Sequence, residues 1–112
     1  MPAQDLDLLR GTLDLLILKT LSWGPMHGYA VLRSLERVTG DRLQVDEGAL
    51  YPALHRMEQK GWLEAEWGIT ERNRKAKYYR LTRTGRQALA AEHRKWARYT
   101  EAVGMVLTAQ GA

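Results

Sequence analysis

The sequence predicts a mainly α-helical domain with one small β-hairpin. Apolar residues recur at helical spacing in three stretches before residue 61 and in a long final stretch, and between these they alternate with polar residues. A chain of 112 residues is long enough for one hydrophobic core and too short for a large multi-domain enzyme. It contains no cysteine, which excludes disulfide bonds, thiolate metal ligands and a cysteine nucleophile.

The first helix is predicted from Leu6 to Leu21, where two apolar stripes run along the same segment. These stripes are Leu9, Leu13, Leu16, Ile17 and Leu21, and Leu8, Leu15 and Leu18. One stripe is expected to face the core and the other a second subunit, although a deeply buried helix would show the same pattern. Gly24 and Pro25 should end the helix. The apolar run is far shorter than the roughly 18 residues that cross a bilayer, and without a leader pattern we expect a cytoplasmic protein.

Two shorter helices are predicted next, at about His27 to Val38 and Asp46 to Lys60. The inner face of the first consists of Val31, Leu32, Leu35 and Val38, and that of the second of Leu50, Ala53, Leu54 and Met57. Asp46 should cap the start of the later helix and Gly61 its end. Because Pro52 removes a backbone hydrogen bond inside this helix, either the helix begins late or its first turn is irregular.

A β-hairpin is predicted after Gly61, because the apolar residues then alternate with polar ones. Leu63, Ala65 and Trp67 mark the first strand, and Tyr79 and Leu81 mark the second. The segment from Gly68 to Ala76 is polar and basic, so we expect it to form a projecting, mobile loop.

A long final helix should begin at Thr84, where Thr84 to Gln87 has the spacing of a capping box. Its residues Leu89, His93, Trp96, Thr100, Val103 and Leu107 alternate at spacings of four and three. This is a heptad seam, and we expect it to pack against a partner chain. The predicted organisation is therefore a domain at residues 1–83 and a C-terminal dimerisation helix at residues 84–112, in one compact unit.

The positive charge of the chain is concentrated in one segment. The formal net charge is +4, but residues 72–86 contain seven basic residues and no acidic residue, so the remaining chain carries 4 − 7 = −3. A solvated surface usually mixes both signs. We therefore interpret this segment as a surface for a polyanion, most commonly nucleic acid.

Three helices, a hairpin with a basic loop and a further helix are the element order of a winged helix-turn-helix domain. In such a domain the third helix lies in the major groove and the loop contacts phosphates or the minor groove. Because the apolar residues of the third helix face the core, its other residues face outward. Asp46 and Glu47 are interpreted as caps of this helix rather than as DNA contacts. The candidate DNA-binding residues are Gly48, Tyr51, Pro52, His55, Arg56, Gln59, Arg72, Arg74, Lys75, Lys77 and Arg80.

The chain resembles the PadR-like transcriptional regulators. The resemblance rests on motifs in the family's order, which are Gly11 to Leu18, His27 to Tyr29, Leu50 to Glu58, Tyr78 to Thr82 and Gly85. The single last helix resembles the short subfamily. The resemblance implies a homodimer built through the first and last helices, a repressor of a palindromic operator and, in some members, a ligand pore at the dimer interface.

The resemblance also implies roles for particular residues. Tyr51 and the hairpin cations match positions of DNA contact, and Trp96 matches an aromatic residue that lines the pore in members that bind flat aromatic ligands. The implied dimerisation residues are Leu9, Leu13, Leu16, Trp96, Thr100, Val103 and Leu107. The candidate residues for a small planar aromatic or phenolic effector are Leu8, Leu15, Leu89, His93 and Trp96.

Other functions are weighed against a DNA-binding regulator. A Trp96 that packs in a dimer core without any ligand is an equal alternative. Ser22 and Ser34 are the only serines, neither lies in a nucleophile elbow, and no glycine-rich phosphate loop is present, so we expect no enzyme and no cofactor. The three histidines are too far apart to suggest a metal site. A winged-helix module that binds protein or RNA, without an effector, is the alternative function.

Overall fold

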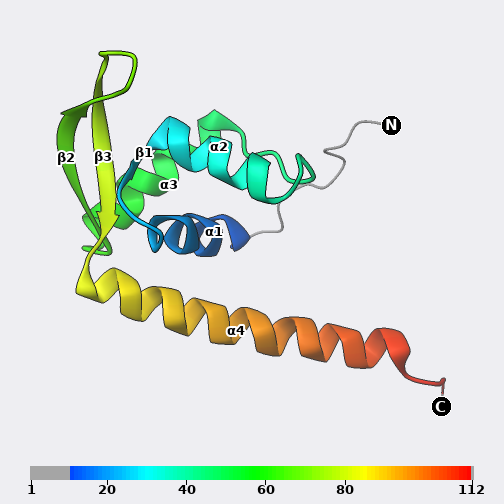
Figure 1. Cartoon of the computed structure of the whole chain (residues 1–112). Helices are drawn as coiled ribbons and strands as arrows, with labels where there is room; N and C mark the ends of the chain where they lie inside the picture. The colour runs from blue at the N-terminus through cyan, green and yellow to red at the C-terminus, as the bar shows by residue number, and fades with distance from the viewer. Residues whose placement is uncertain (1–10, 112) are drawn as a thin grey trace.

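The computed structural model describes residues 11–111 as four helices and a three-stranded antiparallel sheet. In chain order the elements are α1 (Thr12–Leu21), β1 (Met26–His27), α2 (Gly28–Val38), α3 (Glu47–Gln59), β2 (Leu63–Ile69), β3 (Lys75–Leu81) and α4 (Arg83–Thr108). The first three helices and the sheet form one body, and α4 runs beneath this body and beyond it (Figure 1). This is the predicted winged helix-turn-helix with an additional long helix. No helix within residues 11–111 combines the length and apolar composition that crossing a bilayer requires.

One hydrophobic core joins the first three helices to the sheet. Its buried residues come from α1 (Ile17, Leu18, Leu21), α2 (Val31, Leu32, Leu35), the segment before α3 (Val45), α3 (Leu50, Ala53, Leu54, Met57), β2 (Leu63) and β3 (Tyr79, Leu81). Ala88 and Leu89 at the start of α4 pack against this core. The predicted inner faces of the second and third helices are therefore confirmed, except for Val38. That side chain is 57% exposed because it lies in the last turn of α2, beyond the reach of the core.

The predicted first helix is interrupted at Gly11. Gly11 has a φ of 85°, a left-handed conformation that ends regular helical structure, so α1 begins only at Thr12. The part of the prediction before residue 11 lies outside the described residues. The two predicted stripes also do not divide between the core and a second subunit, because Ile17 from one stripe and Leu18 from the other are both fully buried in the core.

Pro52 lies inside α3 without delaying the start of that helix. The helix begins at Glu47, and the Asp46 side chain caps it by accepting a hydrogen bond from the Gly48 amide at 3.2 Å. The missing amide of Pro52 leaves the Gly48 carbonyl without its helical donor. Both residues are exposed, so water can satisfy this carbonyl. A late start is therefore excluded.

The predicted hairpin forms, but its loop is shorter than expected and a third strand joins it. Gly68 pairs with Ala76 and Ile69 with Lys75, so only residues 70–74 remain as the loop. The polar composition suggested a longer loop, but pairing between the strands outweighs it. β1 pairs with β3 as well, a two-residue strand too short to show a pattern in the sequence.

The predicted start of the last helix is wrong by two residues. Thr82, not Thr84, is the N-cap, and its hydroxyl accepts a hydrogen bond from the Gly85 amide at 3.0 Å. The Thr82 amide also donates to the Trp62 carbonyl at 3.0 Å, which attaches the start of α4 to the residue that precedes β2. A Cβ atom at Gly85 would lie 2.1 Å from the same carbonyl oxygen, so only glycine allows this approach.

Candidate nucleic-acid interface

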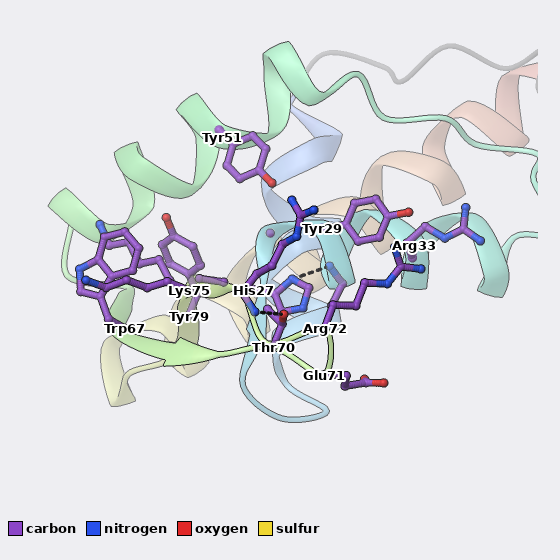
Figure 2. Close-up of a pocket in the computed structure, with 15 residues that line it drawn as sticks. His27, Tyr29, Arg33, Tyr51, Trp67, Thr70, Glu71, Arg72, Lys75 and Tyr79 are labelled. Atoms are coloured by element: carbon purple, nitrogen blue, oxygen red, sulfur yellow. Dashed lines mark hydrogen bonds between the residues drawn. The ribbon is translucent and has the colours of Figure 1, made fainter.

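A groove of about 810 Å³ lies between the start of α2, the middle of α3 and the hairpin. We call it the wing groove, and its lining includes Tyr29 and Arg33 of α2, Tyr51 of α3, and the hairpin from Thr70 to Lys77 except Asn73. Figure 2 shows the side chains of Tyr51, Tyr29 and Arg72 gathered around this groove from three different elements. Residues more than 20 positions apart in the chain therefore share one surface.

The structure brings together part of the predicted DNA-binding set. Tyr51 and the hairpin cations Arg72, Arg74, Lys75 and Lys77 all line the wing groove. The other α3 residues lie outside the groove and are exposed, as predicted; they are Gly48, Pro52, His55, Arg56 and Gln59. Arg80 lies outside the groove as well, since it alternates with Lys77 and Tyr79 along β3.

The position of Tyr51 depends on Gly28 at the start of α2. A Cβ atom at Gly28 would lie 2.5 Å from Cε1 of the Tyr51 ring, so the absence of a side chain there lets the ring rest on α2. Tyr51 nevertheless remains 45% exposed. Partial burial raises the pKa of its phenol, and the nearby Glu47 carboxylate raises it further. The phenol is therefore protonated at neutral pH and can donate a hydrogen bond to a phosphate oxygen.

The hairpin cations differ in whether a carboxylate of the protein already forms an ion pair with them. Lys77 donates a hydrogen bond from Nζ to Oε1 of Glu58 on α3 at 3.0 Å, and this bond raises the pKa of its ammonium. Lys75 Nζ lies 5.3 Å from the centroid of the Trp67 ring. Within residues 11–111, Arg72, Arg74 and Lys75 form no ion pair with a carboxylate, so their charges are available to a polyanion.

Two predicted contacts outside the wing groove also have carboxylate partners. Arg56 donates from Nη2 to Oδ1 of Asp14 on α1 at 2.5 Å. Arg80 donates from Nη2 to Oε2 of Glu64 on β2 at 2.5 Å. The sequence could not show these pairs, because each depends on which elements are neighbours in space.

The loop of the hairpin is closed by its own hydrogen bonds. The Thr70 amide donates to the Arg74 carbonyl at 2.8 Å, and the Arg74 amide donates to the Thr70 hydroxyl at 3.2 Å. Asn73 adopts a φ of 60°, a left-handed conformation that asparagine accepts more readily than most residues. This turn presents Arg72 and Arg74 on exposed positions of the hairpin tip.

Sequence reasoning missed four exposed side chains of the wing groove, namely Tyr29, Arg33, Trp67 and Glu71. Tyr29 and Arg33 are four residues apart on the side of α2 opposite its buried face, so helical spacing could have identified them as a pair. Trp67 lies on the same face of β2 as the buried Leu63 and half-buried Ala65, and it was interpreted only as part of the strand pattern.

The predicted dimerisation and effector residues that the structure describes lie on α1 and α4, away from the wing groove. Leu13 and Leu16 are partly buried against the core, and Leu15 is half-buried. Along α4, Leu89 and Trp96 are half-buried, whereas the remaining seam residues are exposed; these are His93, Thr100, Val103 and Leu107. Leu8 and Leu9 lie outside the described residues. No group of three or more His, Asp or Glu side chains in the described part of the chain is arranged to hold a metal ion.

The chain is similar to known proteins along most of its length. The family model described as "Transcriptional regulator PadR-like family" matches residues 17–91. An uncharacterized protein of Lysinibacillus sphaericus is 31% identical over 101 residues, which cover 90% of this chain and 93% of that protein. A transcriptional regulator of Mycobacterium tuberculosis is 34% identical over 85 residues, 76% of each chain.

Solved structures with the same fold are similar in sequence as well. A PadR family transcriptional regulator from Eggerthella lenta has a TM-score of 0.78 and 33% identity, with 90% of this chain and 86% of that chain covered. A PadR-like transcriptional regulator from Bacillus cereus has a TM-score of 0.76 and 27% identity, with 91% and 97% covered. PadR-like proteins are regulators that bind DNA, and they are not enzymes. The chain belongs to the PadR-like family of transcriptional regulators.

Proposed function

We propose that this regulator binds a palindromic DNA operator as a homodimer and acts as a repressor. The observation that carries the DNA-binding part is the meeting of Tyr51 with Arg72, Arg74 and Lys75 in one groove beside the exposed side of α3. The exposed α3 residues select the sequence in the major groove, and Arg72, Arg74 and Lys75 supply affinity that is independent of sequence. The repressor role rests on the resemblance to the family.

The homodimer is proposed because the far half of α4 carries apolar side chains that its own body does not cover. Tyr99, Val103, Val106 and Leu107 are exposed on this half, which runs beyond the body (Figure 1). A second copy that packs along α1 and α4 would bury them. The predicted division at residues 83 and 84 then separates the DNA-binding unit from the dimerisation helix. Two-fold symmetry requires an operator with two related half-sites.

An effector site at the dimer interface is part of the same proposal. Trp96 is half-buried, and its ring lies 6.0 Å from that of Tyr99, centroid to centroid. A large flat indole suits stacking on a planar aromatic or phenolic ligand, and it suits dimer packing without a ligand equally well. Tryptophan fluorescence and operator affinity, measured with a panel of planar cations and phenolics, separate the two. If neither changes, the effector is excluded for these classes.

Footprinting of the intergenic region upstream of the gene tests the proposed function directly. We expect protection of a short palindrome at nanomolar protein concentration and no protection of scrambled DNA. Sedimentation of the protein should show a dimer, and Val103→Glu should shift it towards monomer, because a charge would then be buried in the interface. Equal affinity for operator, scrambled DNA and RNA would instead favour an interaction module of another kind.

A further inference from the structure

Two ion pairs connect α3 to the elements beside it. Arg56 of α3 is bound to Asp14 of α1 at 2.5 Å, and Glu58 of α3 is bound to Lys77 of β3 at 3.0 Å. The Asp14 side chain is only 23% exposed and that of Arg56 is 49% exposed, so this pair is partly sheltered from water. Arg56 and Lys77 were both predicted to contact DNA, yet each already has a carboxylate partner.

The two ion pairs leave α3 from different sides. Arg56 and Glu58 are two residues apart, which corresponds to a rotation of about 200° around the helix. One pair therefore holds the helix towards α1 and the other towards β3. The buried residues of α3 pack by apolar contact, which is strong but has little directional preference. Ion pairs on opposite sides resist rotation of the helix in both directions.

We propose that Asp14 and Glu58 are positioning residues that fix the rotation of α3 for sequence reading. They act through Arg56 and Lys77, which then contribute to operator binding mainly by holding the helix and not by contacting phosphates. The inference rests on the proposed function, in which exposed α3 residues such as His55 read the operator. A small rotation of α3 would move these side chains relative to the base edges and weaken specific binding.

The replacements Asp14→Asn and Glu58→Gln test this proposal, because electrostatics and positioning predict opposite changes in operator affinity. Each removes a negative charge, so electrostatics alone predicts equal or tighter binding to DNA. Removal of a positioning contact predicts the opposite for the operator. Because exposed ion pairs make modest contributions, we expect operator affinity to fall about two- to fivefold. Glu64→Gln is the matched control, since it removes the same charge from the Arg80 pair, which does not involve α3.

The ratio of operator affinity to scrambled-DNA affinity is the decisive measurement. A variant that is merely less folded loses affinity for both DNAs equally, whereas a rotated α3 lowers only operator affinity. We expect this ratio to fall about two- to fivefold for Asp14→Asn and for Glu58→Gln, to be unchanged for Glu64→Gln, and to recover for Asp14→Glu.

Two results would overturn the inference. The first is a ratio of operator affinity to scrambled-DNA affinity that is the same for Asp14→Asn and Glu58→Gln as for Glu64→Gln. The second is a salt dependence for Arg56→Gln that is flatter by about 0.9 in log–log slope, which would make Arg56 a phosphate-binding residue. If the wild-type protein does not prefer any operator, the proposed function itself fails, and this inference fails with it.

Discussion

Replacing Gly28 by alanine should weaken DNA binding without weakening the fold. The added Cβ atom would lie 2.5 Å from Cε1 of Tyr51, and ordinary contact begins at 3.4 Å, so the ring must move by about 0.9 Å. The ring is the end of a flexible side chain on an exposed surface, so it can move without disturbing the core. The hydroxyl moves with the ring, so a hydrogen bond of about 2.7 Å from the Tyr51 hydroxyl to a phosphate would lengthen by up to about 0.9 Å and be weakened or lost.

The expected decrease in affinity follows from the energy of one hydrogen bond to a charged group. Such a bond contributes about 1.5 kcal/mol, which corresponds to about a tenfold decrease in operator affinity for each protomer. Fluorescence anisotropy with labelled operator measures this, and thermal denaturation should show an unchanged or slightly higher melting temperature, since alanine favours helix.

Tyr51→Phe is the matched variant, because it removes the hydroxyl and keeps the ring. Gly28→Ala and Tyr51→Phe should lose similar affinity, and the double variant should lose no more than either, since both remove the same bond. Wild-type affinity in Gly28→Ala would refute the assigned role of Tyr51. A large fall in melting temperature would instead show that the ring cannot move as argued.

Three further predictions concern the hairpin, the start of α4 and high pH. Arg74→Ala and Lys75→Ala should each flatten the log–log salt dependence of binding by about 0.9 for each phosphate that the side chain neutralises, and an unchanged slope would exclude the hairpin from phosphate binding. Gly85→Ala should destabilise the fold by about 1–3 kcal/mol, because its Cβ would meet a backbone carbonyl that cannot move away; Gly104→Ala in the same helix has nothing within 4 Å and should not destabilise it. Burial raises the pKa of the Tyr79 phenol above the ordinary value of 10.0, because the folded protein favours the neutral phenol. The stability gained from this preference is full below pH 10.0 and is lost as the pH rises through the raised pKa. Denaturant unfolding should show this decline, and Tyr79→Phe should reduce it.

The elements that were predicted well are those with strong local signals. α2 and α3 combine a regular apolar spacing with a capping residue and a terminal glycine, as Asp46 and Gly61 show for α3. The weaker predictions concern boundaries. Gly11 makes α1 begin later than predicted. Thr82 replaces Thr84 as the cap of α4, because the approach of Gly85 to the Trp62 carbonyl decides between two threonines that look equivalent in sequence.

The candidate site was predicted in outline, but the state of its side chains was not. The charge run and the outward face of α3 depend on sequence spacing alone, so Tyr51 and the hairpin cations could be named. Trp67 and the α2 residues Tyr29 and Arg33 were missed because they join the wing groove only when the hairpin folds against α2 and α3.

The sequence by itself determined the order of the elements, the core-facing residues of α3 and the concentration of positive charge, because periodicity, caps and charge runs are local properties. Only the tertiary structure decided which cations remain available to DNA. Asp14 and Arg56 are 42 residues apart in the chain and yet form an ion pair, whereas Arg74 has no carboxylate partner in the described structure. The physical reason is that an ion pair depends on a few ångströms of separation, which only the packing of whole elements can set.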